Sequence, residues 1–195
     1  MNRDKSFARR DESRAIPMKL GVISDTHVAS FGIRKVASHL IQRVNVDEDE
    51  LYKLLKPHFQ GVKAVLHCGD IVDQSVLDML ENFGEVYAVA GNMDPYSIRA
   101  QIPEQRIVEF GKFKIGMIHG WGSPEGLSTR VRQKFAGEKL DCIVFGHSHQ
   151  PYDRVEGGIL MFNPGSATDR RFAPKRTIGI LHLEDRIWGE HIDLA

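Results

Sequence analysis

The chain has 195 residues, of which 42% are hydrophobic, and its 26 basic and 26 acidic side chains give a formal net charge of zero. This suits one globular domain, and the balanced charge gives no electrostatic footprint for bulk nucleic-acid or anionic-membrane binding. Two cysteines are too few for a disulfide framework, and no apolar run is long enough to cross a bilayer. We therefore expect a cytoplasmic protein.

Residues 1–17 mix both charge signs and lack the apolar stretch of a secretory signal. We interpret them as a disordered N-terminal extension that ends near Pro17, followed by a single domain over residues 18–195. Within that domain, residues 28–46 contain no clear strand, and we expect an added loop and helix there.

Short apolar runs rich in Val and Ile alternate with helical patterns along most of the domain. The predicted strands cover residues 19–24, 62–69, 85–91, 112–120 and 141–146, and the predicted helices cover 47–59, 73–83 and 123–135. For the last helix we expect Ser123 as N-cap and Pro124 at the first position. This alternation predicts an α/β fold with a largely parallel sheet, covered on both faces.

The C-terminal third has a different pattern. Residues 152–166 and 175–194 read as hairpin strands with Gly or Asp turns. We expect these hairpins to form a second, more antiparallel sheet packed on the first.

Side chains of metal-ligand type follow each of the five predicted strands. They are Asp25, His27, Asp70, Asn92, His119, His147 and His149. Each short motif alone is better explained as turn or loop chemistry. In open α/β sheets, however, ligands bind beyond the carboxyl ends of the strands. Because five consecutive strand ends supply an oxygen or nitrogen ligand, the set predicts one shared metal site.

The ordered pattern D-T-H, G-D, G-N, H and G-H-S-H resembles that of the calcineurin-like metallophosphoesterase superfamily. It is most similar to the small bacterial and archaeal phosphodiesterases, a branch near the eukaryotic retromer subunit of this fold. The resemblance covers about residues 18–190, including "NPGS" at 163–166. It implies a four-layer αββα sandwich, in which two mixed β-sheets are flanked by helices.

The resemblance also implies two divalent metal ions. Asp25, His27 and His149 would hold one ion, Asn92, His119 and His147 would hold the other, and Asp70 would bridge them. Of these, Asp70, Asn92 and His119 would act in catalysis, through a metal-bound hydroxide and the phosphate. Ligands without thiolate favour Mn, Fe, Ni, Co or Zn over a structural zinc cage, and Mn is our first expectation.

One position departs from the family pattern. Many members carry a histidine directly after "GN", where it is thought to protonate the leaving group, whereas this chain has Met93. Methionine cannot donate that proton, so His67 or a metal-bound water would have to substitute, and action on poor leaving groups should be weak.

Further residues near the motifs have two readings each. Asp94 could orient a metal-ligating histidine or form an Asp-Pro turn. Asp73 could also support the metal site, but we favour a helix N-cap. Substrate contacts are expected from an arginine after "NPGS", for which the candidates are Arg170, Arg171 and Arg176.

These features predict a dimetal phosphodiesterase that hydrolyses small phosphate esters by in-line attack of a bridging hydroxide. The alternatives are a phosphomonoesterase and a non-catalytic metal-binding scaffold for protein partners, like the retromer subunit. A nuclease ranks lower because the chain has neither net positive charge nor room for a nucleic-acid domain. The absence of a long apolar run predicts no membrane association. Because relatives are often dimers or tetramers, a homo-oligomer is an expectation by analogy.

Overall fold

The computed structural model describes residues 17–28, 46–170, 173 and 175–194. The described part therefore leaves out the predicted extension over residues 1–17, except residue 17. It also leaves out the predicted loop and helix over 28–46, except residues 28 and 46. Among the described residues, no helix is both long and apolar enough to cross a bilayer.

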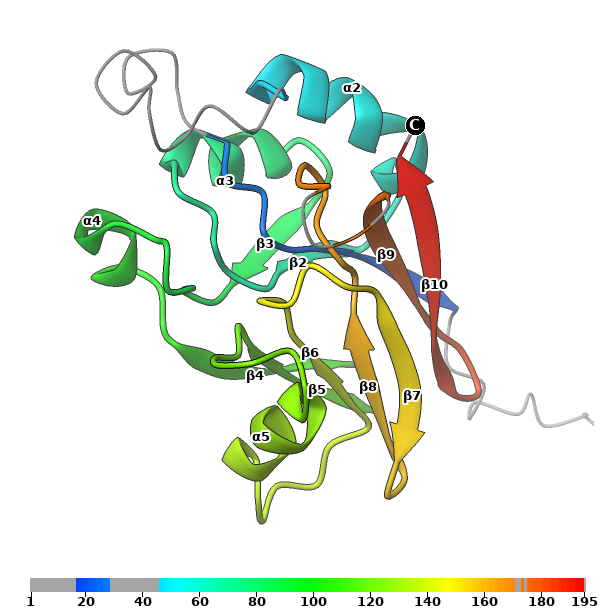
Figure 1. Cartoon of the computed structure of the whole chain (residues 1–195). Coiled ribbons are helices and arrows are strands. Elements are labelled where there is room, and N and C mark those ends of the chain that lie inside the picture. Colours follow the sequence, from blue (N-terminus) through cyan, green and yellow to red (C-terminus); the bar gives the residue numbers. More distant parts are fainter. Residues whose placement is uncertain (1–16, 29–45, 171–172, 174, 195) are drawn as a thin grey trace, which may run out of the picture.

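Two five-stranded sheets form the centre of the molecule (Figure 1). The first has the order β10 (Ile187–Leu194), β9 (Arg176–Leu183), β1 (Met18–Ile23), β2 (Ala64–His67) and β3 (Glu85–Ala88). The second has the order β4 (Gln105–Phe110), β5 (Phe113–Ile118), β6 (Cys142–Val144), β8 (Ile159–Asn163) and β7 (Tyr152–Glu156).

Both sheets are mixed, as the resemblance implied. Strands β1, β2 and β3 are parallel, and so are β5, β6 and β8, whereas β9, β10, β4 and β7 pair antiparallel with their neighbours. The prediction of one parallel sheet from the first five runs was wrong, because those runs divide between the two sheets. The prediction that the C-terminal hairpins form a sheet of their own was also wrong, since each hairpin joins a different sheet.

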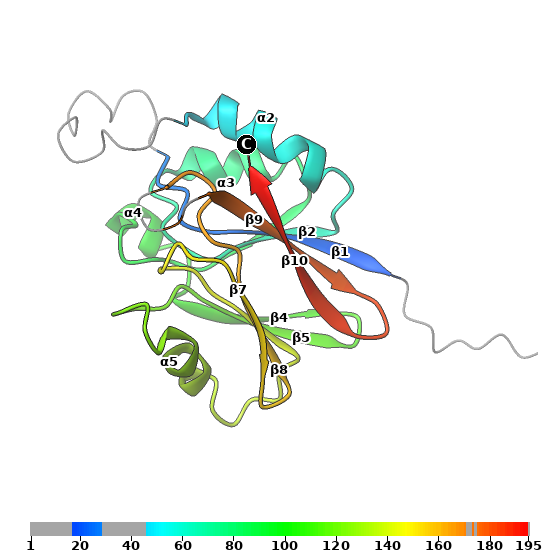
Figure 2. The ribbon, with the colours of Figure 1, turned by 45° about the vertical axis from the view of Figure 1, so that its right-hand side comes forward.

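Helices cover both outer faces of the sheet pair (Figure 2). Helices α2 (Glu48–Phe59) and α3 (Gln74–Leu80) pack on the first sheet, and α5 (Leu127–Lys134) packs on the second. This confirms the four-layer αββα arrangement. The N-cap of α5 is Gly126, so the prediction of Ser123 as N-cap was wrong. Ser123 lies three residues before Gly126, and its Oγ accepts the N–H of Glu125, which precedes the helix.

The alternation of side chains along the strands builds three core layers. In β1, Leu20 and Val22 point between the sheets, while Ile23 packs against the helices. Gly21 shares the helix-facing side, where a Cβ would lie only 2.9 Å from the ring of Phe59. In β6 the same alternation sends Cys142 between the sheets and Ile143 toward α5.

Two elements between β3 and β5 were not predicted. They are the short helix α4 (Tyr96–Arg99) and strand β4. In β4 the polar and apolar residues of "QRIVEF" are mixed, because this edge strand is only partly covered. The segment therefore lacks the continuous apolar run that marked the central strands.

Candidate metal centre

The loops after β1, β2, β3, β5 and β6 converge at one end of the sheet pair. Backbone hydrogen bonds join neighbouring loops within each sheet: Asp25 N donates to Gly69 O at 3.0 Å in the first, and Gly146 N donates to His119 O at 3.0 Å in the second. The carboxyl ends of parallel strands lie at the same edge of a sheet, which is why residues far apart in the sequence meet here.

Left-handed backbone geometry turns most of the predicted ligands back toward this point. Five of them have positive φ: Asp25 at 52°, His27 at 47°, Asp70 at 55°, His147 at 70° and His149 at 58°. This region is sterically costly for most L-residues, and Asp and His are among those that enter it most often. Strained backbone of this kind concentrates at functional sites, where the surrounding structure maintains it.

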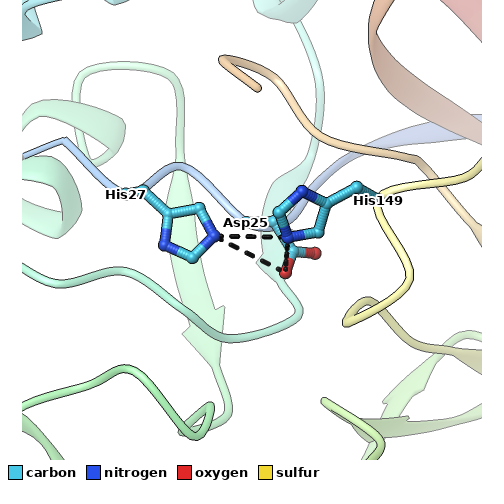
Figure 3. A group of neighbouring side chains, drawn as sticks. All are labelled: Asp25, His27 and His149. Carbon is cyan, nitrogen blue, oxygen red and sulfur yellow. Dashed lines mark hydrogen bonds and ion pairs between the residues drawn. The ribbon is translucent and has the colours of Figure 1, made fainter. Parts of the chain in front are cut away.

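A first cluster consists of Asp25, His27 and His149 (Figure 3). His149 Nε2 lies 3.2 Å from Asp25 Oδ1 and 3.3 Å from His27 Nε2, and His27 Nε2 lies 4.0 Å from the same carboxylate oxygen. The three ligand atoms lie within 4.8 Å of one another, so a single ion could contact all of them.

A second cluster shares Asp25 and adds Asp70 and His119. Asp70 Oδ2 lies 3.4 Å from His119 Nε2 and 3.8 Å from His27 Nε2. This carboxylate oxygen therefore lies between one imidazole of each predicted metal position. Its other oxygen, Oδ1, accepts the backbone N–H of Met93 at 2.7 Å, which fixes the orientation of the carboxylate.

Asn92 and His147 complete the group on the more exposed side. His147 Nδ1 lies 3.1 Å from Asn92 Oδ1, and His147 Nε2 lies 2.9 Å from the carbonyl oxygen of Gly122. The ring of His147 also lies edge-on to that of His119, with 5.2 Å between centroids. The structure thus brings all seven predicted residues together.

The hydrogen-bond partners of the histidines indicate which ring nitrogens face the centre. Nδ1 of His119 donates to Cys68 O at 2.7 Å, and Nε2 of His147 donates to Gly122 O, because a carbonyl can only accept. Nδ1 of His149 lies 3.1 Å from the carboxylate of Asp169. In a neutral imidazole the remaining nitrogen carries a lone pair, which here faces other acceptors.

This donor set fits a cation. His147 Nδ1 and Asn92 Oδ1 are both acceptors yet lie 3.1 Å apart, and His119 Nε2 faces the carboxylate of Asp70. Asp25 Oδ1 and His119 Nε2 are buried and have no hydrogen-bond partner among the described residues. Lone pairs that converge in this way need a positive charge between them, and hydrogen bonds behind the imidazoles are the usual support of metal ligands.

The pKa shifts of the metal-free chain have the same origin. Burial alone would raise the pKa of Asp25, but contact with His149 and the charges of the nearby imidazoles outweigh it and lower the pKa. Burial would lower the pKa of His119, but Asp70 and Asp25 raise it to about 9. The site therefore keeps its carboxylates ionised beside a positive charge. When no metal is bound, a proton on an imidazole supplies that charge.

The residues predicted to support the centre have other contacts. Asp94 accepts three backbone N–H groups, from Ile71 at 2.6 Å, Val72 at 2.8 Å and Gly91 at 2.7 Å, so it holds two ligand-bearing loops together rather than orienting a histidine. Asp73 accepts the N–H of Ser75 at 3.0 Å, which confirms the predicted cap of α3.

His67 cannot reach a substrate. Its side chain is fully buried, Nδ1 accepts the N–H of Gly69 at 3.2 Å, and Nε2 lies 3.2 Å from Thr26 Oγ1. Burial lowers its pKa to about 3, so it is neutral and cannot act as the general acid at neutral pH. Met93 is 59% exposed beside Asn92, and its side chain supplies no proton.

Of the candidate arginines, the structure describes Arg170 and Arg176. Arg176 points toward α2, where its Nη1 lies 4.0 Å from Glu50 Oε1. Arg170 is exposed, and Arg171 lies outside the described residues.

The segment after β8 has a role that the sequence did not reveal. Asp169, 1% exposed, contacts His149, and Ser166 Oγ donates to the backbone oxygen of Asp25 at 2.7 Å. Thr168 Oγ1 donates to Thr26 O at 2.6 Å. The segment that begins at the "NPGS" turn thus brings two hydroxyl side chains onto the loop after β1 and one carboxylate onto His149 in the loop after β6. The position of Asp169 just after this turn was the available signal.

The two mixed sheets and the metal-type cluster at their strand ends define a metallophosphoesterase architecture. The chain matches the calcineurin-like phosphoesterase superfamily domain over residues 18–186, and it belongs to this family. A probable metallophosphoesterase of Methanocaldococcus jannaschii is 34% identical over 173 residues, which cover 87% of this chain and 78% of that protein.

Solved structures show the same fold. A structurally and functionally characterised archaeal phosphodiesterase has a TM-score of 0.65 and 23% identity, covering 91% of this chain and 100% of its own. Vps29 of Entamoeba histolytica in complex with Zn²⁺ has a TM-score of 0.56 and 23% identity, covering 91% of this chain and 100% of its own.

Proposed function

We propose that this phosphoesterase-family chain is a dimetal phosphodiesterase that acts on small phosphate esters. The observation that carries the proposal is the position of Asp70 Oδ2, 3.8 Å from His27 Nε2 and 3.4 Å from His119 Nε2. A carboxylate between two imidazoles of separate clusters is the arrangement that a bridging ligand requires. The archaeal phosphodiesterase of the same fold supports the choice of diesters.

In this proposal the site would hold two divalent ions. Asp25, His27 and His149 would hold the first, Asn92, His119 and His147 would hold the second, and Asp70 would be shared. When bound, the two ions supply a deprotonated water at neutral pH and neutralise the phosphate. The chain contributes orientation: Cys68 O, Gly122 O and Asp169 each fix one imidazole.

The donor set of carboxylates, an amide and imidazoles suits Mn, Fe, Ni, Co or Zn, and we propose Mn first. The Vps29 structure with Zn²⁺ shows that a chain of this fold can bind zinc. Because the two carboxylates together carry two negative charges, two divalent ions leave the site positive, which favours an anionic ester.

The test uses metal-stripped protein with and without Mn²⁺, assayed on bis-p-nitrophenyl phosphate and on p-nitrophenyl phosphate. We expect metal-dependent hydrolysis that prefers the diester and is lost in Asp70→Asn. The matched control is Asp47→Asn, because Asp47 caps α2 by accepting Glu50 N at 2.9 Å and asparagine caps equally well. A preference for the monoester would instead support a phosphomonoesterase.

A metal-binding scaffold for protein partners is the second candidate. It is favoured by Met93, which leaves the site without the histidine that would protonate a leaving group. In that case calorimetry would show stoichiometric metal binding by the wild type, weakened in Asp70→Asn, while neither ester is hydrolysed with any of the five metals.

A further inference from the structure

A cavity of about 430 Å³ opens directly beside the candidate metal centre. Asn92 and His119, which belong to the centre, form part of its wall, and Trp121, Lys134 and Arg99 are among the other residues that line it. Its volume lies within the range of small-molecule sites. A substituent of a phosphate held at the centre would therefore extend into this cavity.

Trp121 gives the cavity an aromatic wall. Its side chain is 41% exposed, although tryptophan is highly buried on average. Ile118, only 6% exposed, lies in the same wall and adds apolar surface. An indole presented to a cavity offers a flat surface on which another ring can stack.

The loop that carries Trp121 is held in place before any ligand binds. From α5, the Arg130 guanidinium donates to the carbonyl of Trp121 at 3.1 and 3.0 Å, to that of Glu125 at 2.8 Å, and to that of Ser123. The carbonyl of Gly122 in the same loop accepts from His147. The aromatic wall is thus tied to the metal centre, and a ligand would not have to order it.

The charges of the cavity suit an anionic ligand. Arg99 and Lys134 contribute two positive charges, and Glu104 contributes one negative charge. Glu104 lies 3.6 Å from Arg99, whereas Lys134 Nζ lies over the Trp121 ring, 5.3 Å from its centroid. Lys134 thus places a positive charge beside the Trp121 ring, where it would attract the anionic part of a ligand whose planar ring stacks on the indole.

We propose that this cavity selects phosphodiesters that carry a planar aromatic substituent, either a nucleobase or an aryl ring, which stacks on Trp121 while the phosphate lies at the metal centre. This inference rests on the proposed function and names its substrate class. It assigns Trp121 as the residue that determines specificity and Arg130 as a positioning residue.

The test measures binding of monoesters, which are products of diester hydrolysis, to the Mn²⁺-loaded protein. Trp121 and Trp188 are the two tryptophans of the chain, so Trp188→Phe leaves Trp121 as the only indole reporter. We expect adenosine 5′-monophosphate or phenyl phosphate to quench Trp121 fluorescence and to bind roughly tenfold more tightly than ethyl phosphate, as stacking predicts.

Calorimetry on the otherwise native chain then compares two variants. Trp121→Ala should reduce the affinity for the aromatic ester to that for ethyl phosphate, with ethyl phosphate binding unchanged. Trp121→Phe should keep most of the preference. Selective binding of adenosine 5′-monophosphate would assign the cavity to a nucleobase reached through ribose, and selective binding of phenyl phosphate would assign it to a ring attached directly to the phosphate.

Equal affinities of the wild type for aromatic and ethyl esters would overturn the inference. Hydrolysis of bis-p-nitrophenyl phosphate in the same preparation would show that the proposed function still holds. If the protein neither hydrolyses the diester nor binds ethyl phosphate, the proposed function fails, and this inference fails with it.

Discussion

The buried carboxylate of Asp169 lies 3.1 Å from Nδ1 of His149, whose Nε2 lies 3.2 Å from Asp25 Oδ1. A carboxylate behind an imidazole fixes the tautomer that aims the other nitrogen at a metal, and it makes that nitrogen a better ligand. The relationship gives Asp169 an effect on the metal centre although it does not face the centre itself.

Asp169→Asn should therefore weaken metal binding by about 10- to 100-fold, since losses of this size follow removal of such partners. Titration of the metal-stripped protein with Mn²⁺ in a calorimeter measures the affinity. Asp193→Asn is the matched control, because Asp193 is an exposed carboxylate that pairs with Lys175. Unchanged affinity in Asp169→Asn would mean that His149 is oriented by other contacts.

Asp94→Ala should destabilise the fold. The three N–H groups that the carboxylate accepts would lose their partner, and each buried donor left without one costs about 1–3 kcal/mol. We expect a loss of about 3 kcal/mol or more in the free energy of unfolding, measured by urea denaturation of the metal-free protein. Asp94→Asn, which keeps one acceptor oxygen, should show a smaller loss; equal losses would indicate that charge matters more than hydrogen bonding.

His67 should make the stability of the metal-free protein depend on pH. Its pKa is about 3 in the folded chain, because burial opposes the charged form, and about 6.5 when unfolded. The unfolded state binds more protons between these values, so the contribution of His67 is present above pH 6.5 and is lost as the pH falls toward 3.

The corresponding measurement compares urea denaturation of the wild type and His67→Gln between pH 8 and pH 4. Above pH 7 the difference in unfolding free energy should be constant. Below pH 6 the wild type should lose about 1.4 kcal/mol per pH unit relative to the variant. Parallel pH profiles would show that His67 is not held neutral by the fold.

Met93→His should improve hydrolysis of diesters with poor leaving groups. The Met93 side chain is 59% exposed, and its backbone N–H would keep its bond to Asp70. General acid catalysis contributes about 10²–10⁴-fold, so we expect a gain of at least about tenfold in kcat for an alkyl leaving group and little change for p-nitrophenolate. Met93→Gln, which has similar size but no titrating group, is the control, and an equal gain in both variants would contradict the explanation.

Much of the fold was predictable because continuous apolar runs mark buried strands. Strands β2, β3, β5 and β6 fall within predicted runs, and β1 begins one residue before its run. The assignment of strands to sheets was not predictable from those runs, because a run shows only that both faces are covered and not which strand lies beside it. The β9–β10 hairpin pairs with β1, more than 150 residues earlier in the chain, and no local pattern encodes such a pairing.

For the metal centre, the expectation that ligands lie beyond the carboxyl ends of the strands grouped seven side chains from five separate loops. What it missed are contacts that depend on tertiary structure. Asp169 lies in a turn after β8, and only the folded chain brings it to His149. The same limit applies to His67, which was considered as a substitute proton donor but whose side chain is enclosed by Thr26 and Gly69.

The left-handed backbone at the strand ends has a consequence for how this sequence can change over evolutionary time. At Asp25, His27, Asp70, His147 and His149, most replacements would be opposed by local sterics as well as by lost metal contacts. Asn92 and His119 are not among the positive-φ residues, so local backbone sterics do not oppose their replacement. In a descendant that abandons hydrolysis and keeps the fold, Asn92 and His119 should therefore diverge first.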